Sequence, residues 1–259
     1  MKRTILSFIL IEILLGYKMY GQIKHFVFQG KIEFVKTVNT YAILGRRINK
    51  ENEAYSGPAF EHYKQENPQF RKYKSILTFG SQKALYTPLE NQDAPKNDFF
   101  GGEATMGQIN TVYMDLNAGI LIDQKKVFEE TFLVKDSLRN THWKITSETR
   151  EIAGFTCRRA NALILDSIYV VAFYTDQIPV SSGPELFSGL PGMILEVSLP
   201  HENMTWLASS VTESFNSAND IQPPKKGKST DFKGLKTNLL SVMKSWGNYA
   251  QYYLKSFFL

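Results

Sequence analysis

The chain has 259 residues, 43% hydrophobic and 13% aromatic, so it is long enough to bury a sizeable core as one all-β domain. The formal net charge at pH 7 is +5, and the basic residues are dispersed along the chain. Without a basic stripe, nucleic acid is not an expected partner. The 13 tyrosines and 18 phenylalanines favour strands over helices.

The N-terminus has the features of an export signal. Lys2 and Arg3 precede an apolar run, residues 4–15, which fits a signal peptide and is too short to span a bilayer. Because small residues follow, we expect residues 1–21 to be a signal peptide cleaved after Gly21. The protein is then exported to the periplasm or cell envelope. No cysteine lies near this cleavage site, so we expect no lipid anchor through an N-terminal cysteine.

From residue 22 onwards, short alternating segments dominate the sequence. We expect strands or hairpins over residues 22–37, 73–89, 111–123, 127–136, 143–151, 155–174 and 193–215. Gly30 reads as a bulge in the first strand, residues 59–65 as a short helix, and residues 91–107 as a polar surface loop. Short strands at this spacing indicate an antiparallel meander. We therefore predict a mainly β fold over residues 22–228, an antiparallel curved sheet or open half-barrel.

Residues 229–259 follow a linker-like stretch and show a different period. Apolar residues recur three or four positions apart, at Leu235, Leu239, Val242, Met243, Trp246, Tyr249 and Tyr253. This spacing predicts an amphipathic C-terminal helix packed on the sheet. Lysines lie among these aromatic residues, at Lys233, Lys236, Lys244 and Lys255. A helix lying on a membrane surface is therefore the alternative interpretation.

The densest group of glycine and proline lies within residues 174–197, between two extended segments. Each proline restricts the residue before it, and each glycine permits backbone angles closed to other residues, so this stretch predicts a rigid, shaped loop. We predict that the loop binds a ligand or a partner. The candidate residues are Tyr174, Asp176, Pro179, Gly183, Pro184, Phe187, Gly189, Leu190, Pro191 and Gly192.

Catalytic and metal-binding motifs are scarce. The sequence has no HExxH, CxxC or GxSxG motif and no phosphate-binding loop, and its four histidines lack metal-ligand spacing. We therefore expect no catalytic residue, metal or cofactor. The single cysteine, Cys157, cannot form an internal disulfide and is expected to be a small buried side chain. An envelope hydrolase remains the alternative, using Cys157 with His142, or the carboxylates Asp176 and Glu185, which could instead hold the loop by hydrogen bonds.

The run GLPGMI, residues 189–194, resembles the signature of the GLPGLI family of secreted Bacteroidetes-type proteins. The family's upstream segment is matched at Trp143, Ile152, Gly154, Phe155, Cys157, Arg159 and Ala160. The resemblance covers residues 109–215, and Met193 stands where leucine is usual. It implies an exported envelope protein and supplies no active site, because the family is uncharacterised.

These features favour a non-enzymatic binding or accessory protein of the cell envelope. The expected partner is an apolar or peptide-like ligand held in the curved sheet, or an outer-membrane protein. The aromatic-rich strands, the rigid loop and the missing catalytic motifs all favour binding over catalysis.

Overall fold

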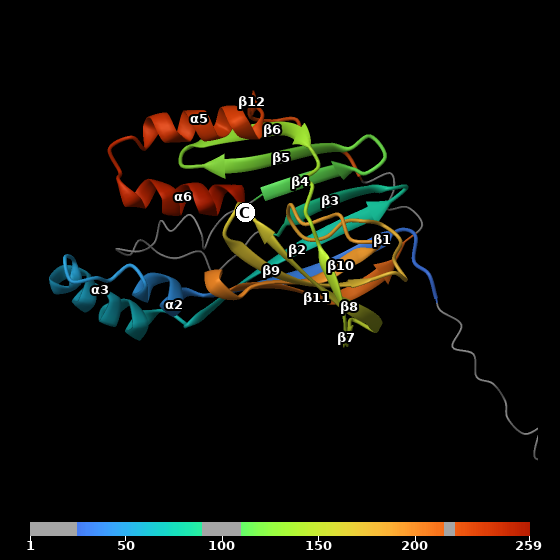
Figure 1. Cartoon of the computed structure of the whole chain (residues 1–259), viewed down its shortest axis with the longest axis horizontal. Helices are drawn as coiled ribbons and strands as arrows, with labels where there is room; N and C mark the ends of the chain where they lie inside the picture. The colour runs from blue at the N-terminus through green and yellow to red at the C-terminus, as the bar shows by residue number, and fades with distance from the viewer. Residues whose placement is uncertain (1–24, 90–109, 215–220) are drawn as a thin grey trace, which may run out of the picture.

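The computed structural model describes residues 25–89, 110–214 and 221–259. In this part of the chain, one sheet of twelve strands forms the body of the molecule, and helices lie at its borders (Figure 1). The predicted mainly β fold is confirmed. The expected signal peptide and the expected loop over residues 91–107 lie outside the described residues.

The strands are β1 (Gly30–Asn39), β2 (Phe70–Gly80), β3 (Lys83–Pro88), β4 (Asn110–Asp115), β5 (Ile120–Val127), β6 (Glu130–Ser137), β7 (Lys144–Ile152), β8 (Phe155–Ile164), β9 (Ile168–Thr175), β10 (Met193–Leu199), β11 (Met204–Glu213) and β12 (Lys228–Thr230). The helices are α2 (Thr40–Gly45), α3 (Glu53–Glu66), the short 3-10 helix η1 (Pro200–Glu202), α5 (Phe232–Val242) and α6 (Asn248–Phe258). The helix expected over residues 59–65 is therefore longer than predicted.

The sheet consists of two antiparallel meanders joined at its centre. Its strand order is β12-β6-β5-β4-β3-β2-β1-β11-β10-β9-β8-β7. The chain runs outward from β1 to β6, crosses to β7 at the opposite border, and returns strand by strand to β11, which pairs with β1. All neighbours are antiparallel except β12, which adds to β6 in parallel.

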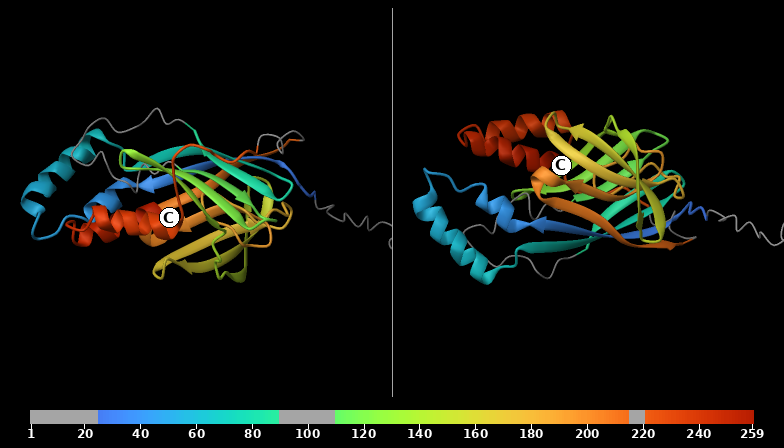
Figure 2. Two further views of the ribbon diagram at one scale, coloured as in Figure 1. Left: turned by 90° about the horizontal axis from the view of Figure 1, so that it is seen from above. Right: turned by 60° about the horizontal axis from the view of Figure 1, so that its bottom comes forward.

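The crossing segment between β6 and β7 requires the sheet to be curled. Residues 138–143 connect these strands, which lie ten positions apart in the strand order. Six residues span at most about 25 Å, so the two strands must approach each other across the open side. Figure 2 shows the resulting half-barrel from two further directions.

The first strand begins later than its sequence pattern suggests. β1 starts at Gly30, where it pairs with Phe79 of β2 and Glu213 of β11. Phe26 and Phe28 lie before that pairing begins and are 44% and 63% exposed, so the strand expected over residues 22–37 is present but its expected start is wrong. The predicted bulge at Gly30 is also wrong, because the register with β11 shifts at Glu33 and Phe34 instead.

The predicted C-terminal helix is present and is divided in two. Gly247, with a φ of +54°, separates α5 from α6. Their inner faces bury Leu235, Leu239, Leu254 and Phe257 against residues of β5 and β6. Among the described residues, no helix is both long and apolar enough to cross a membrane.

Candidate functional site

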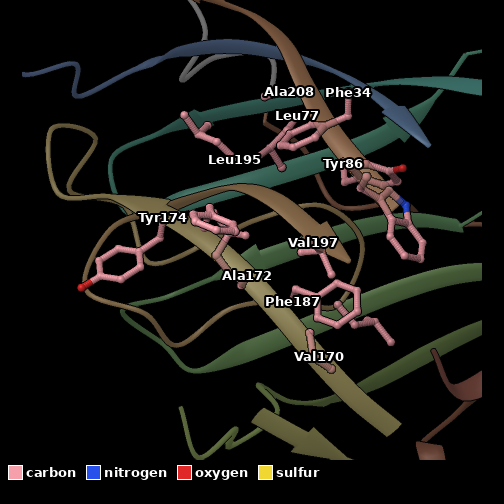
Figure 3. Close-up of a cluster of buried hydrophobic side chains, with 14 of the residues drawn as sticks. Phe34, Leu77, Tyr86, Val170, Ala172, Tyr174, Phe187, Leu195, Val197 and Ala208 are labelled. Carbon is pink, nitrogen blue, oxygen red and sulfur yellow. The ribbon is translucent and has the colours of Figure 1, made fainter. Parts of the chain in front are cut away.

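The loop between β9 and β10, residues 176–192, is here termed the signature loop, and it lies inside the curve of the sheet. Its apolar side chains are at most 3% exposed: Ile178, Val180, Leu186, Phe187 and Leu190. Figure 3 shows Phe187 beside Val170 and Val197 of the surrounding strands. The loop thus contributes to the main hydrophobic core of the described residues.

Short-range hydrogen bonds satisfy much of the buried backbone of this loop. The amides of Val180, Ser182 and Gly192 each donate to the carbonyl two residues earlier, at 2.8 Å. Gly192 has a φ of +148°, and a Cβ added there would lie 2.0 Å from the carbonyl oxygen of Thr175. Only glycine fits this position without moving the neighbouring backbone.

Glu185 anchors the signature loop to three strands. Its carboxylate accepts hydrogen bonds from Asn110 Nδ2 of β4 at 2.8 Å and from Trp206 Nε1 of β11 at 3.0 Å. Lys36 Nζ of β1 lies 3.5 Å from the same carboxylate and 4.9 Å from the Trp206 ring centroid. All four side chains are buried. Glu185 therefore holds the loop by hydrogen bonds, which was the alternative to a catalytic role for this carboxylate.

A second buried charge cluster joins the sheet to α6. Asp123 and Lys125 of β5 lie 2.9 Å apart with fully buried side chains, and Lys125 Nζ donates to the carbonyl oxygen of Phe257 at 2.6 Å. Arg139 donates to the carbonyl oxygen of Phe258 at 2.7 Å. Burial raises the pKa of Asp123 and lowers that of Arg139, because it disfavours both charged forms.

Sequence reasoning did not identify these buried charges, although one signal was present. On β1 the buried positions alternate as Ile32, Phe34, Lys36 and Val38, so a lysine occupies an apolar face. Such a lysine requires a buried partner, but the sequence does not show that the partner is Glu185, 149 positions away.

A cleft of about 890 Å³ opens to solvent at the rim of the signature loop, and it is here termed the rim cleft. It is lined by His25, Thr149, Glu151, Gly154, Thr156, Arg158, Tyr174, Asp176, Gln177 and Pro191. These residues come from the ends of β7, β8 and β9, from the loop itself, and from the segment before β1.

The strand register arranges the floor of the rim cleft as two rows of side chains. One row holds Thr149, Arg158 and Tyr174, and the next pairs Glu151 with Thr156. Asp176 directly follows β9, two residues after Tyr174. Because alternate strand residues share a face, Thr156 and Arg158 point to the same side as Ala160 and Ala162, which are buried. The cleft is therefore the solvent-facing end of the sheet surface that packs on the signature loop.

The rim cleft combines hydroxyl groups with charges of both signs. Thr156 Oγ1 donates to Glu151 Oε1 at 2.6 Å, and His25 Nε2 lies 3.3 Å from Glu213. Arg158 and Asp176 add an exposed cation and anion. Among the described residues, no group of histidine, cysteine and acidic side chains could hold a metal ion. The lining suits a ligand that offers both hydrogen-bond donors and acceptors, as a peptide does.

Eight of the ten candidate residues from the sequence lie in this cleft or in the core, and two lie in neither. Tyr174, Asp176 and Pro191 line the cleft. Buried positions are Gly183, Pro184, Phe187, Leu190 and Gly192. Gly189 is exposed next to Trp143, and Pro179 is partly exposed and accepts a hydrogen bond from Gln82 through its carbonyl oxygen.

The groups proposed for a hydrolase are not arranged for catalysis. Cys157 is fully buried, and burial together with nearby Glu151 and Glu196 raises the pKa of its thiol to about 12. Cys157 pairs with Arg150, whereas His142 precedes β7 at the far end of the same hairpin. Asp176 lies in the exposed cleft and Glu185 in the core, so the two carboxylates do not share one solvent-facing site.

Residues 162–196, which include the signature loop, match the model of a family described as "Protein of unknown function (Porph_ging)". Comparison with curated protein sequences gave no match. Two solved structures of PNGF-II, in space groups C2 and P21, show TM-scores of 0.49 and 0.48 at 15% and 16% identity. The similarity covers 78% of this chain and 31% and 32% of PNGF-II, so the chain spans about a third of that protein's length. The matched family thus resembles this chain at the signature loop and supplies no known function.

Proposed function

We propose that this chain is a non-enzymatic binding protein of the cell envelope whose rim cleft takes an extended peptide-like segment. The supporting observation is the cleft itself, which lies at the rim of the signature loop and is lined by hydroxyl, acidic and basic groups. An apolar ligand inside the curved sheet has less support, because the side chains of the loop fill the core there.

The neighbouring strand β7 suits an extended peptide. In the described part of the chain, β7 lies at one border of the sheet and pairs only with β8. The outer edge of such a strand presents backbone N–H and C=O groups, and a peptide can bind by adding to them as a further strand. A peptide bound there would lie beside Thr149 and Glu151, which β7 contributes to the rim cleft.

Site-specific crosslinking in the native host tests this proposal. A photoreactive residue at Thr156 lies in the cleft, whereas one at Leu163, 65% exposed on the other face of β8, is the matched control. We expect a discrete peptide or envelope protein to be captured from position 156 and not from 163. Identical products from both positions, or none from position 156, would contradict the proposal.

A variant pair tests whether cleft charges recognise the captured molecule. Arg158→Gln and Asp176→Asn each remove a charge from the rim cleft and leave a polar side chain in its place. We expect each to reduce crosslinking from position 156. Unchanged capture by both variants would show that binding does not use the cleft.

We further propose that the protein is exported and is of the GLPGLI type, because its signal-like N-terminus and its GLPGMI run occur together. Protein isolated from the host envelope should begin at Gln22 when its N-terminus is sequenced. Recovery of full-length chain from the cytoplasm alone would contradict export.

A further inference from the structure

Basic residues are dispersed along the chain, but acidic residues are scarce in its last part, so the net positive charge is highest there. Residues 221–259 contain seven lysines and one aspartate, a net charge of +6, whereas the whole chain carries +5. The remaining 220 residues therefore sum to −1. Such an asymmetry makes this segment suited to an anionic surface.

Exposed apolar side chains gather in the same region. Leu240 and Val242 of α5 are 41% and 59% exposed, and Trp246, which follows that helix, is 37% exposed. Phe128, in the turn between β5 and β6, packs edge-on against Trp246 with ring centroids 5.6 Å apart. These four residues are here termed the outer patch.

The lysines of α5, and Lys244 just after it, are exposed, whereas the buried apolar residues of the same segment face the core. Leu235, Leu239 and Met243 are buried against the sheet, whereas three lysines are exposed at Lys233, Lys236 and Lys244. Two acids lie next to Phe128: Glu129 is exposed, and Glu130 lies 3.4 Å from Lys228. The balance of charge around the outer patch remains positive.

We propose that α5 and the β5–β6 turn dock on the surface of an anionic phospholipid membrane. Tryptophan and phenylalanine are suited to the boundary between headgroups and acyl chains, and the lysines are attracted to anionic headgroups. α5 would lie flat, since its other face remains packed on the sheet. This contact is separate from the rim cleft and adds a membrane to the peptide-like ligand proposed there.

Vesicle binding by the purified protein tests this surface. Vesicles of phosphatidylcholine and phosphatidylglycerol in equal parts should bind the protein, and vesicles of phosphatidylcholine alone should bind it much more weakly. The double variant Lys236→Gln/Lys244→Gln should bind anionic vesicles about 25-fold more weakly, because each lysine near such a surface contributes about five-fold. High salt should weaken binding of the unaltered protein.

A matched control distinguishes the effect of lysines on this face from the effect of the protein's net charge. Lys50→Gln/Lys144→Gln removes the same charge from exposed positions after α2 and on β7, which Figure 1 places away from α5, and should bind normally. Quenching of tryptophan fluorescence by bromine-labelled lipid should occur in the unaltered protein and be lost in Trp246→Phe. Absence of binding, equal binding to neutral vesicles, equal loss in the control, or quenching that survives Trp246→Phe would overturn the proposal.

Discussion

Gly192 shows how strongly a single residue constrains the signature loop. An alanine there would combine a positive φ with a Cβ 2.0 Å from the backbone of Thr175. We expect Gly192→Ala to lower the free energy of unfolding in urea by at least about 1–3 kcal/mol. Gly154→Ala is the control, because Gly154 also has a positive φ and no atom within 4 Å of the added Cβ. Equal losses in both variants would show that the close approach at Gly192 costs nothing.

Cys157 gives a prediction about pH at the same scale. Its pKa rises from the ordinary 9.0 to about 12 in the folded protein, so between these values the unfolded state loses the thiol proton first. Stability from this group is complete below about pH 9 and falls as pH rises toward 12. Across that range, Cys157→Ala should lose less stability than the unaltered protein in denaturant titrations, and an equally steep loss would contradict the assignment.

The sequence predicted the burial of Cys157 and the shaped loop, but it did not show where the loop lies relative to the sheet. The density of Gly and Pro predicted a rigid loop, and the structure adds that its residues Phe187 and Leu190 belong to the core. The apolar residues that recur through residues 178–190 were the sequence signal for the burial of this loop. Their contacts with strands such as β1 and β11 depend on tertiary pairing that local patterns do not contain.

Among the elements, the crossing segment between β6 and β7 contacts the signature loop. Trp143, in this segment, donates from Nε1 to the carbonyl oxygen of Ser188 at 2.9 Å. Trp143→Phe keeps an aromatic ring but removes this bond, so we expect faster amide hydrogen exchange over residues 181–192 with global stability lowered by about 1 kcal/mol. The control Trp246→Phe, remote from the loop, should leave that exchange unchanged. Equal exchange in the Trp143 variant and the unaltered protein would show that the bond does not hold the loop.

The buried charges connect the signature loop with the central strands. Removing one member of a buried pair leaves the other without its counter-charge, so Glu185→Ala should cost about 3–5 kcal/mol in the free energy of unfolding. Lys36→Met in the Glu185→Ala background should recover part of that loss, because the uncompensated lysine is gone. The exposed pair Glu148 and Arg159 is the control, where Glu148→Gln should cost less than about 1 kcal/mol. No recovery in the double variant would contradict the pairing.

For the whole molecule, the antiparallel meanders could be predicted because each hairpin is local in sequence. The alternation of apolar and polar residues, together with the turn residues, predicted the hairpins β2–β3 and β8–β9 within a few residues of their observed bounds. The pairing of β1 with β11, which sets the order of the entire sheet, joins residues far apart, such as Lys36 and Trp206. The strand β12 was not predicted, because three residues in a lysine-rich stretch are too few to show an alternation of apolar and polar side chains.

Most of the signature loop, including residues 182–188, lies in the interior of the protein. Hydrogen–deuterium exchange resolved to single amides tests this interior position directly on the free protein. The amides of Ser182 and Phe187, which donate to carbonyls within the loop, should exchange as slowly as those of the flanking strands β9 and β10. Exchange of these amides at the rate of an exposed loop, while β9 and β10 stay protected, would contradict the account.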